Sequence, residues 1–119
     1  MMRLEDILSM VVAKVKEIAA IEDRIYYIYP PVDAAYPCIS YYDVSTIHDV
    51  RDDESVPLEF VLSFDLFSTE PVYSLEKSLD EALEELTIKK RKESSVPIND
   101  PFLPDIYRRN VQYRFIWNF

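Results

Sequence analysis

The side chains that could support catalysis are few in this chain and stand far apart. Cys38 is the only cysteine and His48 the only histidine among 119 residues. A nucleophile needs a base within hydrogen-bond reach, and His48 falls in a polar stretch typical of a surface loop. A lone cysteine cannot form an internal disulfide or complete a zinc site. We expect no catalytic pair, and we expect Cys38 to act as a small apolar residue in a strand.

Carboxylates could instead create a site by binding a metal ion. Asp49, Asp52, Asp53 and Glu54 cluster around Arg51, but the stretch lacks the glycine and the terminal glutamate of a calcium loop. The chain contains no glycine at all, which excludes the glycine-rich loops that cradle phosphates in P-loop and dinucleotide-binding folds. We therefore predict a solvated hairpin tip here, no metal or other cofactor, and no enzyme activity.

The charge balance argues against nucleic-acid partners. Lys and Arg number 13 against 22 Asp and Glu, which gives a formal net charge of −9. Affinity for phosphate backbones comes from clustered cations, and the only basic run is Lys89–Lys92. That run follows an acidic helix whose C-terminal dipole it complements, so we interpret it as structural, with a local phosphate contact as the alternative. We predict no specific nucleic-acid binding.

Hydropathy gives no sign of a membrane partner either. The longest apolar run covers only a few residues, and Arg3, Glu5 and Asp6 interrupt the N-terminus where a signal peptide needs a clean apolar core. We expect no membrane span and a protein that is cytosolic or assembled from the cytosol.

Two segments carry the apolar spacing of amphipathic helices. With 49% hydrophobic residues the chain is apolar enough to fold, and its length suits one domain over residues 1–119. Apolar residues recur three and four positions apart over residues 4–19 and again over residues 71–87. This periodicity predicts two helices that each bury one face.

Strand chemistry appears between and after these helices. Residues 57–67 and 109–119 alternate with a period of two, and residues 38–46 are mostly β-formers. We interpret 25–29 as a short extended or edge segment and 89–95 as a more polar strand. The three prolines within 96–104 predict an irregular loop.

The order of elements restricts the architecture. It reads helix, two or three strands, helix, one or two strands, with short connections and no βαβ repeat. The economical packing is an α+β two-layer sandwich, in which an antiparallel or mixed sheet of about four strands carries both helices on one face.

Tyrosines crowd the region around the first strands. Six of the nine tyrosines fall between positions 26 and 42. A two-layer fold buries one face of each strand, so adjacent pairs such as Tyr26–Tyr27 must send one ring outward. Long loops or a neighbouring subunit could cover these rings, and tyrosine is enriched at interfaces. We predict at least one subunit contact, with these candidates: Tyr26, Tyr27, Tyr29, Tyr41 and Tyr42.

Two short phrases carry a family resemblance. The expected first helix runs into Asp23-Arg24-Ile25-Tyr26, and Ala35-Tyr36-Pro37-Cys38-Ile39 then opens a strand. This opening resembles that of tail-terminator (tail-completion) proteins of tailed bacteriophages and prophages, over about residues 18–45. The chain departs from the family pattern in two ways, because Tyr27–Tyr29 intervene before Pro30 and because the loops carry no glycine.

The resemblance implies a structural role without catalysis. Family members have an α+β sandwich and form rings, usually hexamers, that cap the tail tube and offer a surface for the head. The implied partners are copies of itself, the tail tube protein and a head-tail connector protein. The implied location is the virion tail, after assembly in the host bacterial cytoplasm. The candidate β-arm that contacts the tail or a neighbour is the acidic hairpin: Asp49, Arg51, Asp52, Asp53 and Glu54.

Two other functions remain open at this point. One is a small acidic monomeric binding or inhibitor protein of the DNA-mimic type, which needs its carboxylates gathered on one surface. The other is a neighbouring head-tail connector protein, which differs from a terminator only in the ring that it touches.

Overall fold

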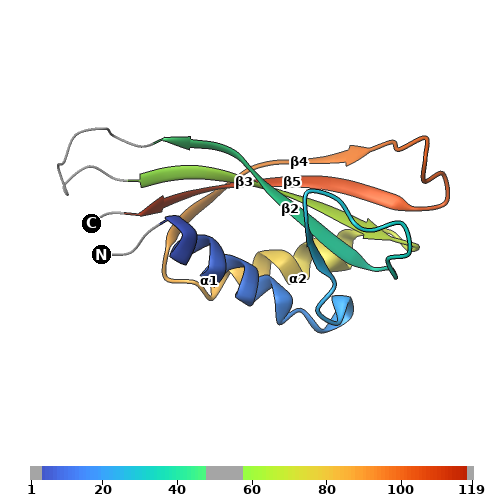
Figure 1. Ribbon diagram of the computed structural model, residues 1–119, viewed down its shortest axis with the longest axis horizontal. Coiled ribbons are helices and arrows are strands. Elements are labelled where there is room, and N and C mark those ends of the chain that lie inside the picture. Colours follow the sequence, from blue (N-terminus) through green and yellow to red (C-terminus); the bar gives the residue numbers. More distant parts are fainter. Residues whose placement is uncertain (1–3, 48–57, 118–119) are drawn as a thin grey trace.

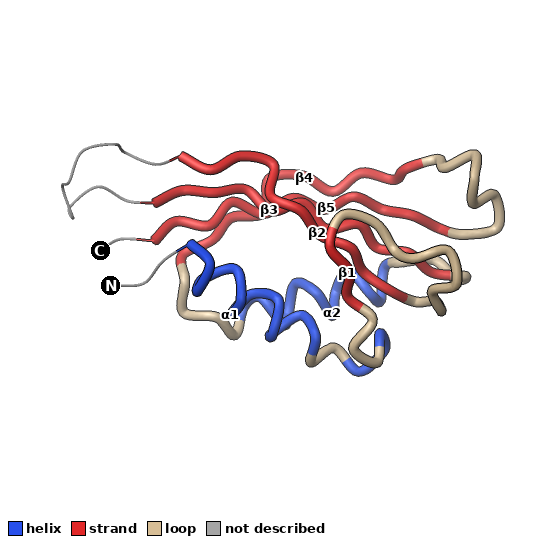
Figure 2. The backbone as a smooth tube through the Cα atoms, in the orientation of Figure 1, coloured by secondary structure: helices blue, strands red, loops and turns tan. Residues whose placement is uncertain are grey.

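Two helices and one sheet form two layers in the computed structural model, which describes residues 4–47 and 58–117 (Figure 1). In chain order the elements are α1 (Leu4–Lys16), the 3-10 turn η1 (Ala19–Ile21), β1 (Ile25–Tyr27), β2 (Cys38–Ile47), β3 (Leu58–Ser68), α2 (Tyr73–Glu84), β4 (Lys89–Ile98) and β5 (Tyr107–Trp117). The five strands lie in the order β1-β2-β3-β5-β4, with β1 parallel to β2 and the other neighbours antiparallel. Both helices lie on one face of the sheet, as Figure 2 shows. The predicted α+β two-layer sandwich is confirmed, with one strand more than the expected number of about four.

The core lies between the helices and β3, the central strand. Alternate side chains of β3 are fully buried in it: Phe60, Leu62, Phe64 and Leu66. The helices contribute residues at three- and four-residue spacing: Ile7, Val11 and Val15 from α1, and Leu75, Leu79 and Leu83 from α2. Burying each such side chain contributes about 1.5–3 kcal/mol. The two predicted apolar stripes therefore face the sheet, as expected.

A second, smaller apolar cluster lies on the far face, meaning the face of the sheet opposite the helices. Cys38 pairs with Phe67 across β2 and β3, and both are fully buried although they lie outside the core that the helices cover. The rings of Tyr29 and Tyr36 cover Phe67, with ring centroids 5.7 and 6.5 Å away. Residues 28–37 therefore fold back over this part of the far face. Cys38 has the small apolar role in a strand that the sequence predicts.

Both helices are shorter than the apolar periodicity indicates. The first ends at Lys16 rather than near residue 19, because Ile18 adopts extended backbone angles before η1. Ile18 and Ile21 are nevertheless buried, so the apolar pattern continues past the end of the helix. The second helix occupies Tyr73–Glu84 within the expected 71–87.

The predicted loop at 96–104 was wrong at its start, because β4 continues to Ile98. Pro97 lies in that strand and pairs with Arg109 of β5. Proline cannot donate to a ladder, which excludes it from central strands, but an edge strand can turn that position toward its open side. Since β4 is the edge of the sheet, Pro97 is compatible with it.

Candidate functional site

Side chains that could bind a metal ion are dispersed in the part of the chain that the structure describes. Within residues 4–47 and 58–117, no three His, Cys, Asp or Glu side chains converge to hold a metal ion. In the same ranges no helix has the length and hydropathy needed to cross a membrane. His48 and the candidate β-arm (Asp49, Arg51, Asp52, Asp53 and Glu54) lie outside the described residues.

The buried carboxylates of the far face are bound by an arginine. Arg108 Nη2 lies 3.0 Å from Asp65 Oδ2, and Arg108 Nη1 lies 2.9 Å from Asp100 Oδ2. Tyr29 Oη donates to the same oxygen of Asp100 over 3.2 Å. The side chains of Asp65 and Asp100 are only 4% and 7% exposed, so these ions are shielded from water. Their arrangement ties β3, β5 and the segment after β1 together.

Electrostatics and packing reinforce this cluster. The backbone N–H of Phe102 holds the pKa of Asp100 below its usual value, and the hydrogen bonds from Tyr29 and Arg108 act in the same direction. The Arg108 guanidinium also lies over the rings of Tyr29 and Phe67, 5.6 and 5.1 Å from their centroids. The sequence did not predict this cluster, because Arg108 meets Asp65 from 43 positions away and Tyr29 meets Asp100 from 71 positions away.

A second set of ion pairs fixes α2 to the sheet. Glu76 binds Lys92 and Arg109, and its pKa is lowered because the hydrogen bonds from Lys92 and Ser95 outweigh the effect of burial. Lys90 Nζ donates to the carbonyls of Leu86 and Ile88, over 2.8 and 3.1 Å, just past the helix. Two residues of the basic run, Lys90 and Lys92, therefore make structural contacts with α2 and the carbonyls that follow it.

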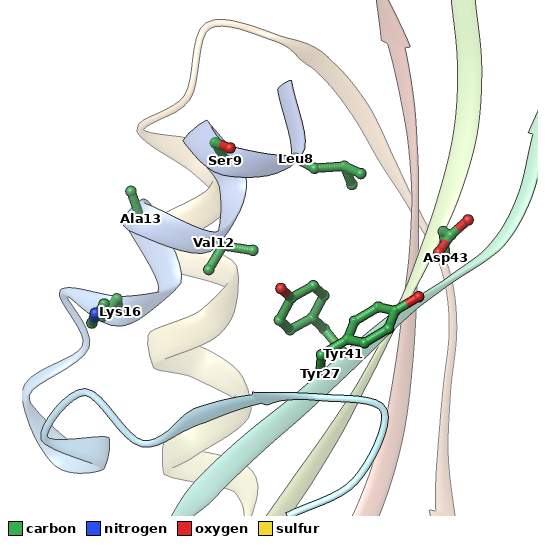
Figure 3. Close-up of a pocket in the computed structure, with 8 residues that line it drawn as sticks. All are labelled: Leu8, Ser9, Val12, Ala13, Lys16, Tyr27, Tyr41 and Asp43. Atoms are coloured by element: carbon green, nitrogen blue, oxygen red, sulfur yellow. The ribbon is translucent and has the colours of Figure 1, made fainter. Parts of the chain in front are cut away.

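A groove opens between α1 and the edge of the sheet (Figure 3). Its volume is about 530 Å³, and its lining consists of Leu8, Ser9, Val12, Ala13, Lys16, Tyr27, Tyr41 and Asp43. Figure 3 shows Leu8 and Val12 extending from α1 on the side where the two tyrosine rings lie. The rings of Tyr27 and Tyr41 meet edge to face, with centroids 5.5 Å apart. The groove thus has apolar walls with one cation and one carboxylate near its rim.

The five candidate interface tyrosines do not form one patch. Tyr27 pairs with Tyr41 and lines the groove, where Tyr27 is 59% exposed. Tyr26 pairs with Ser40 and, like Tyr42, points to the far face. Tyr29 lies on the buried Arg108 cluster and is still 46% exposed. Adjacent rings do point to opposite faces, as the strand period requires.

The outer edge of β2 is only half covered. β1 pairs with Ile39–Tyr41, and the Ile28 N–H adds one more bond to the Tyr41 carbonyl over 2.8 Å. From Tyr42 to Ile47 no strand within the described ranges pairs with this side of β2. An open strand edge offers unpaired N–H and C=O groups to another chain. The sequence did not indicate this edge, because nothing local to β1 gives its partner or the point where pairing stops.

No family model and no curated protein matches the sequence. Among solved structures, the fold is similar to one chain of a structure described as "Virion of native gene transfer agent (GTA) particle". The TM-score is 0.60 at 12% sequence identity, and the match covers 92% of this chain and 92% of that chain. At this identity the likeness concerns the fold.

Proposed function

We propose that this chain is a non-catalytic structural protein of a phage-type virion. The observation that carries the proposal is the fold likeness to a chain of a gene transfer agent virion, which spans 92% of both chains. Because the match spans almost the whole of both chains, it compares the complete arrangement of helices and strands. A match over a few elements alone would be common among unrelated α+β proteins. The resemblance of Asp23–Tyr26 and Ala35–Ile39 to tail terminators supports the same assignment.

The finer proposal is a ring of identical subunits that caps the tail tube and joins it to the head. In this ring the candidate tyrosines mediate the contacts between subunits, since a tyrosine buries a large area and keeps a polar tip. The groove rim with Tyr27 and Tyr41 is one such contact, and the far-face rings of Tyr26 and Tyr42 belong to another. Tyr29, Asp49, Arg51, Asp52, Asp53 and Glu54 complete the proposed contacts with a neighbour or the tail.

The state of the buried carboxylates supports a role without catalysis. Asp65, Asp100 and Glu76 are each bound by at least one Arg or Lys, so their geometry serves packing between elements. A carboxylate that acts as a general acid or base instead has a pKa tuned toward neutral pH, where proton transfer is efficient. The pKa values of Asp100 and Glu76 are shifted downward, away from that range.

Light scattering on the purified protein, with and without tail tubes from the same locus, tests the proposal. We expect a ring of about six subunits, alone or on the tubes, with an interface of about 1,000 Å² or more per contact. Tyr27→Ala should weaken assembly, because it removes an exposed ring from the groove rim. Tyr107→Ala is the matched control, since Tyr107 is also about half exposed, at 52%, but lies on β5 away from the groove. A strict monomer that ignores tubes and binds a basic protein would instead favour the acidic binding module.

A further inference from the structure

The segment between β1 and β2, Ile28–Pro37, is anchored between its ends mainly by two aromatic rings; it is called the strap below. In Figure 2 it is the loop that follows β1 and folds back along the sheet. After Ile28 its backbone-to-backbone bonds are short-range, from Tyr29 N–H to the Tyr27 carbonyl and from Ala34 N–H to the Pro31 carbonyl. Its middle is open to solvent, with Val32 fully exposed. The strap therefore has few bonds that would have to break if it lifted off.

The strap begins at a strained residue. Ile28 has a φ of 71°, in the left-handed region that a β-branched residue adopts only at a cost, and its side chain is 57% exposed. Burial of Ile28 does not offset that cost. The strain favours any state in which Ile28 can return to an extended or helical conformation.

Backbone carbonyls and N–H groups fix the two ends of the strap: the Ile28 N–H donates to the Tyr41 carbonyl over 2.8 Å, and Arg24 Nε donates to the Pro37 carbonyl over 3.0 Å. Between these ends Tyr29 and Tyr36 hold the strap down, and the Arg108 guanidinium lies over the Tyr29 ring. Tyr29 Oη donates to Asp100 Oδ2 over 3.2 Å, and Tyr29 and Tyr36 pack on Phe67. Beneath the strap lie Phe67 and Cys38, both with no exposed surface. By contrast, the core under the helices shares none of these contacts, because Phe67 and Cys38 lie outside it.

We infer that the strap opens as a unit, pivoting at Ile28 and released at Tyr29, while the sheet and the helices stay folded, and that opening bares the Phe67–Cys38 patch of the far face. This is local opening of the kind that low-stability loops undergo in many proteins. The inference does not depend on the proposed function. It makes the far face a surface with two states, one covered and one apolar.

Cys38 reports on the strap without any modification of the chain, because it is the only cysteine. In the closed state it is buried, and burial raises the pKa of its thiol to about 11. Thiol reagents react with the thiolate, so the closed state should be inert at pH 8. The labelling rate of native protein by Ellman's reagent at pH 8 therefore measures how often the strap is open.

We expect Cys38 to be labelled at least about a hundredfold faster than it would be if only globally unfolded molecules reacted. We also expect the labelling rate to be independent of urea at low concentrations. Tyr29→Phe keeps the ring and loses the bond to Asp100, so labelling should accelerate about tenfold. Asparagine adopts the left-handed conformation at less cost than isoleucine, so Ile28→Asn should stabilise the closed strap and slow labelling about fivefold. Tyr27→Phe, the matched control, removes the neighbouring hydroxyl, which faces the groove, and should leave the rate unchanged.

Leu79→Ala separates strap opening from global unfolding. Leu79 lies on the buried face of α2, in the core that does not include Cys38 or Phe67, so this variant should lower global stability without touching the strap contacts. An unchanged labelling rate in Leu79→Ala supports the inference. Acceleration in Leu79→Ala together with a urea slope equal to that of global unfolding would overturn it. So would a rate at or below the global limit, or equal rates for Tyr29→Phe, Tyr27→Phe and the unmodified chain.

Discussion

Replacing Arg108 by Met should be among the most destabilising single changes on the far face. Arg108 is the only described cation that contacts both Asp65 and Asp100, and its own side chain is 20% exposed. Methionine has similar length and fills the space over Phe67 without a charge. The substitution therefore removes the two ion pairs and keeps most of the packing.

The cost follows from what remains behind. Breaking a buried ion pair by removing one partner costs about 3–5 kcal/mol, because the other charge stays buried and unpaired. Asp65 keeps the hydrogen bond from Asn110 Nδ2 at 2.9 Å, and Asp100 keeps the Phe102 N–H at 3.0 Å. These partners place the expected loss near the lower end, at about 3 kcal/mol. Adding Asp65→Asn to Arg108→Met should restore at least about 1 kcal/mol, because it removes the stranded charge.

Urea denaturation followed by circular dichroism measures both values. With a slope of about 1.5 kcal/mol/M, a loss of about 3 kcal/mol shifts the midpoint down by about 2 M. Arg91→Met is the matched control, because the Arg91 side chain is 70% exposed and pairs with Glu93 at the surface. It should cost less than about 1 kcal/mol. A loss below about 1 kcal/mol in Arg108→Met, or no recovery in the double variant, would refute the reasoning.

Three further outcomes can be measured on the same purified chain. The pKa of Asp100 is lowered, so its contribution to the free energy of unfolding is present above the usual Asp pKa of about 3.9 and is lost as the pH falls below it. Asp100→Asn should therefore reduce the loss of stability at acid pH in urea titrations, and an unchanged loss would contradict this. Burial, and after it the hydrogen bond to the Asp80 carboxylate, raise the pKa of Tyr113, so the free energy of unfolding should fall as the pH rises above the usual Tyr pKa of about 10. In the same urea titrations Tyr113→Phe should show a smaller fall at alkaline pH. Leu79→Ala should lower the free energy of unfolding by about 3 kcal/mol, whereas Val44→Ala, at a position 49% exposed, should change it by less than about 0.5 kcal/mol; similar losses in calorimetry would show that the core is misplaced.

The sequence predicted the layers of this fold because periodicity reports burial directly. The alternation of β3 from Phe60 to Leu66 and the stripes of α1 and α2 each identify a buried face. Boundaries were less predictable, because apolar spacing continues where the backbone has already left the helix, as at Ile18. Pro97 predicted a loop where β4 continues, because the effect of a proline depends on whether its strand lies at an edge of the sheet.

The surfaces were harder to predict than the elements. Adjacent tyrosines had to point both ways, and Tyr26 and Tyr27 do so. Which ring lines a groove and which lies on a buried arginine depends on pairings between distant residues. Arg108 meets Asp65 from 43 positions away and Tyr29 meets Asp100 from 71, and no local pattern encodes such contacts. The same limit hid the half-covered edge of β2.

The mass of the protein on assembled tail tubes tests the central proposal most directly. Tubes are mixed with a concentration series of the chain, and light scattering of the separated species is combined with electron microscopy of the tube ends. The structural proposal predicts a ring of about six copies at the tube end, weakened by Tyr27→Ala and retained by Tyr107→Ala. A chain that stays monomeric at every concentration and leaves the tube ends bare would contradict it.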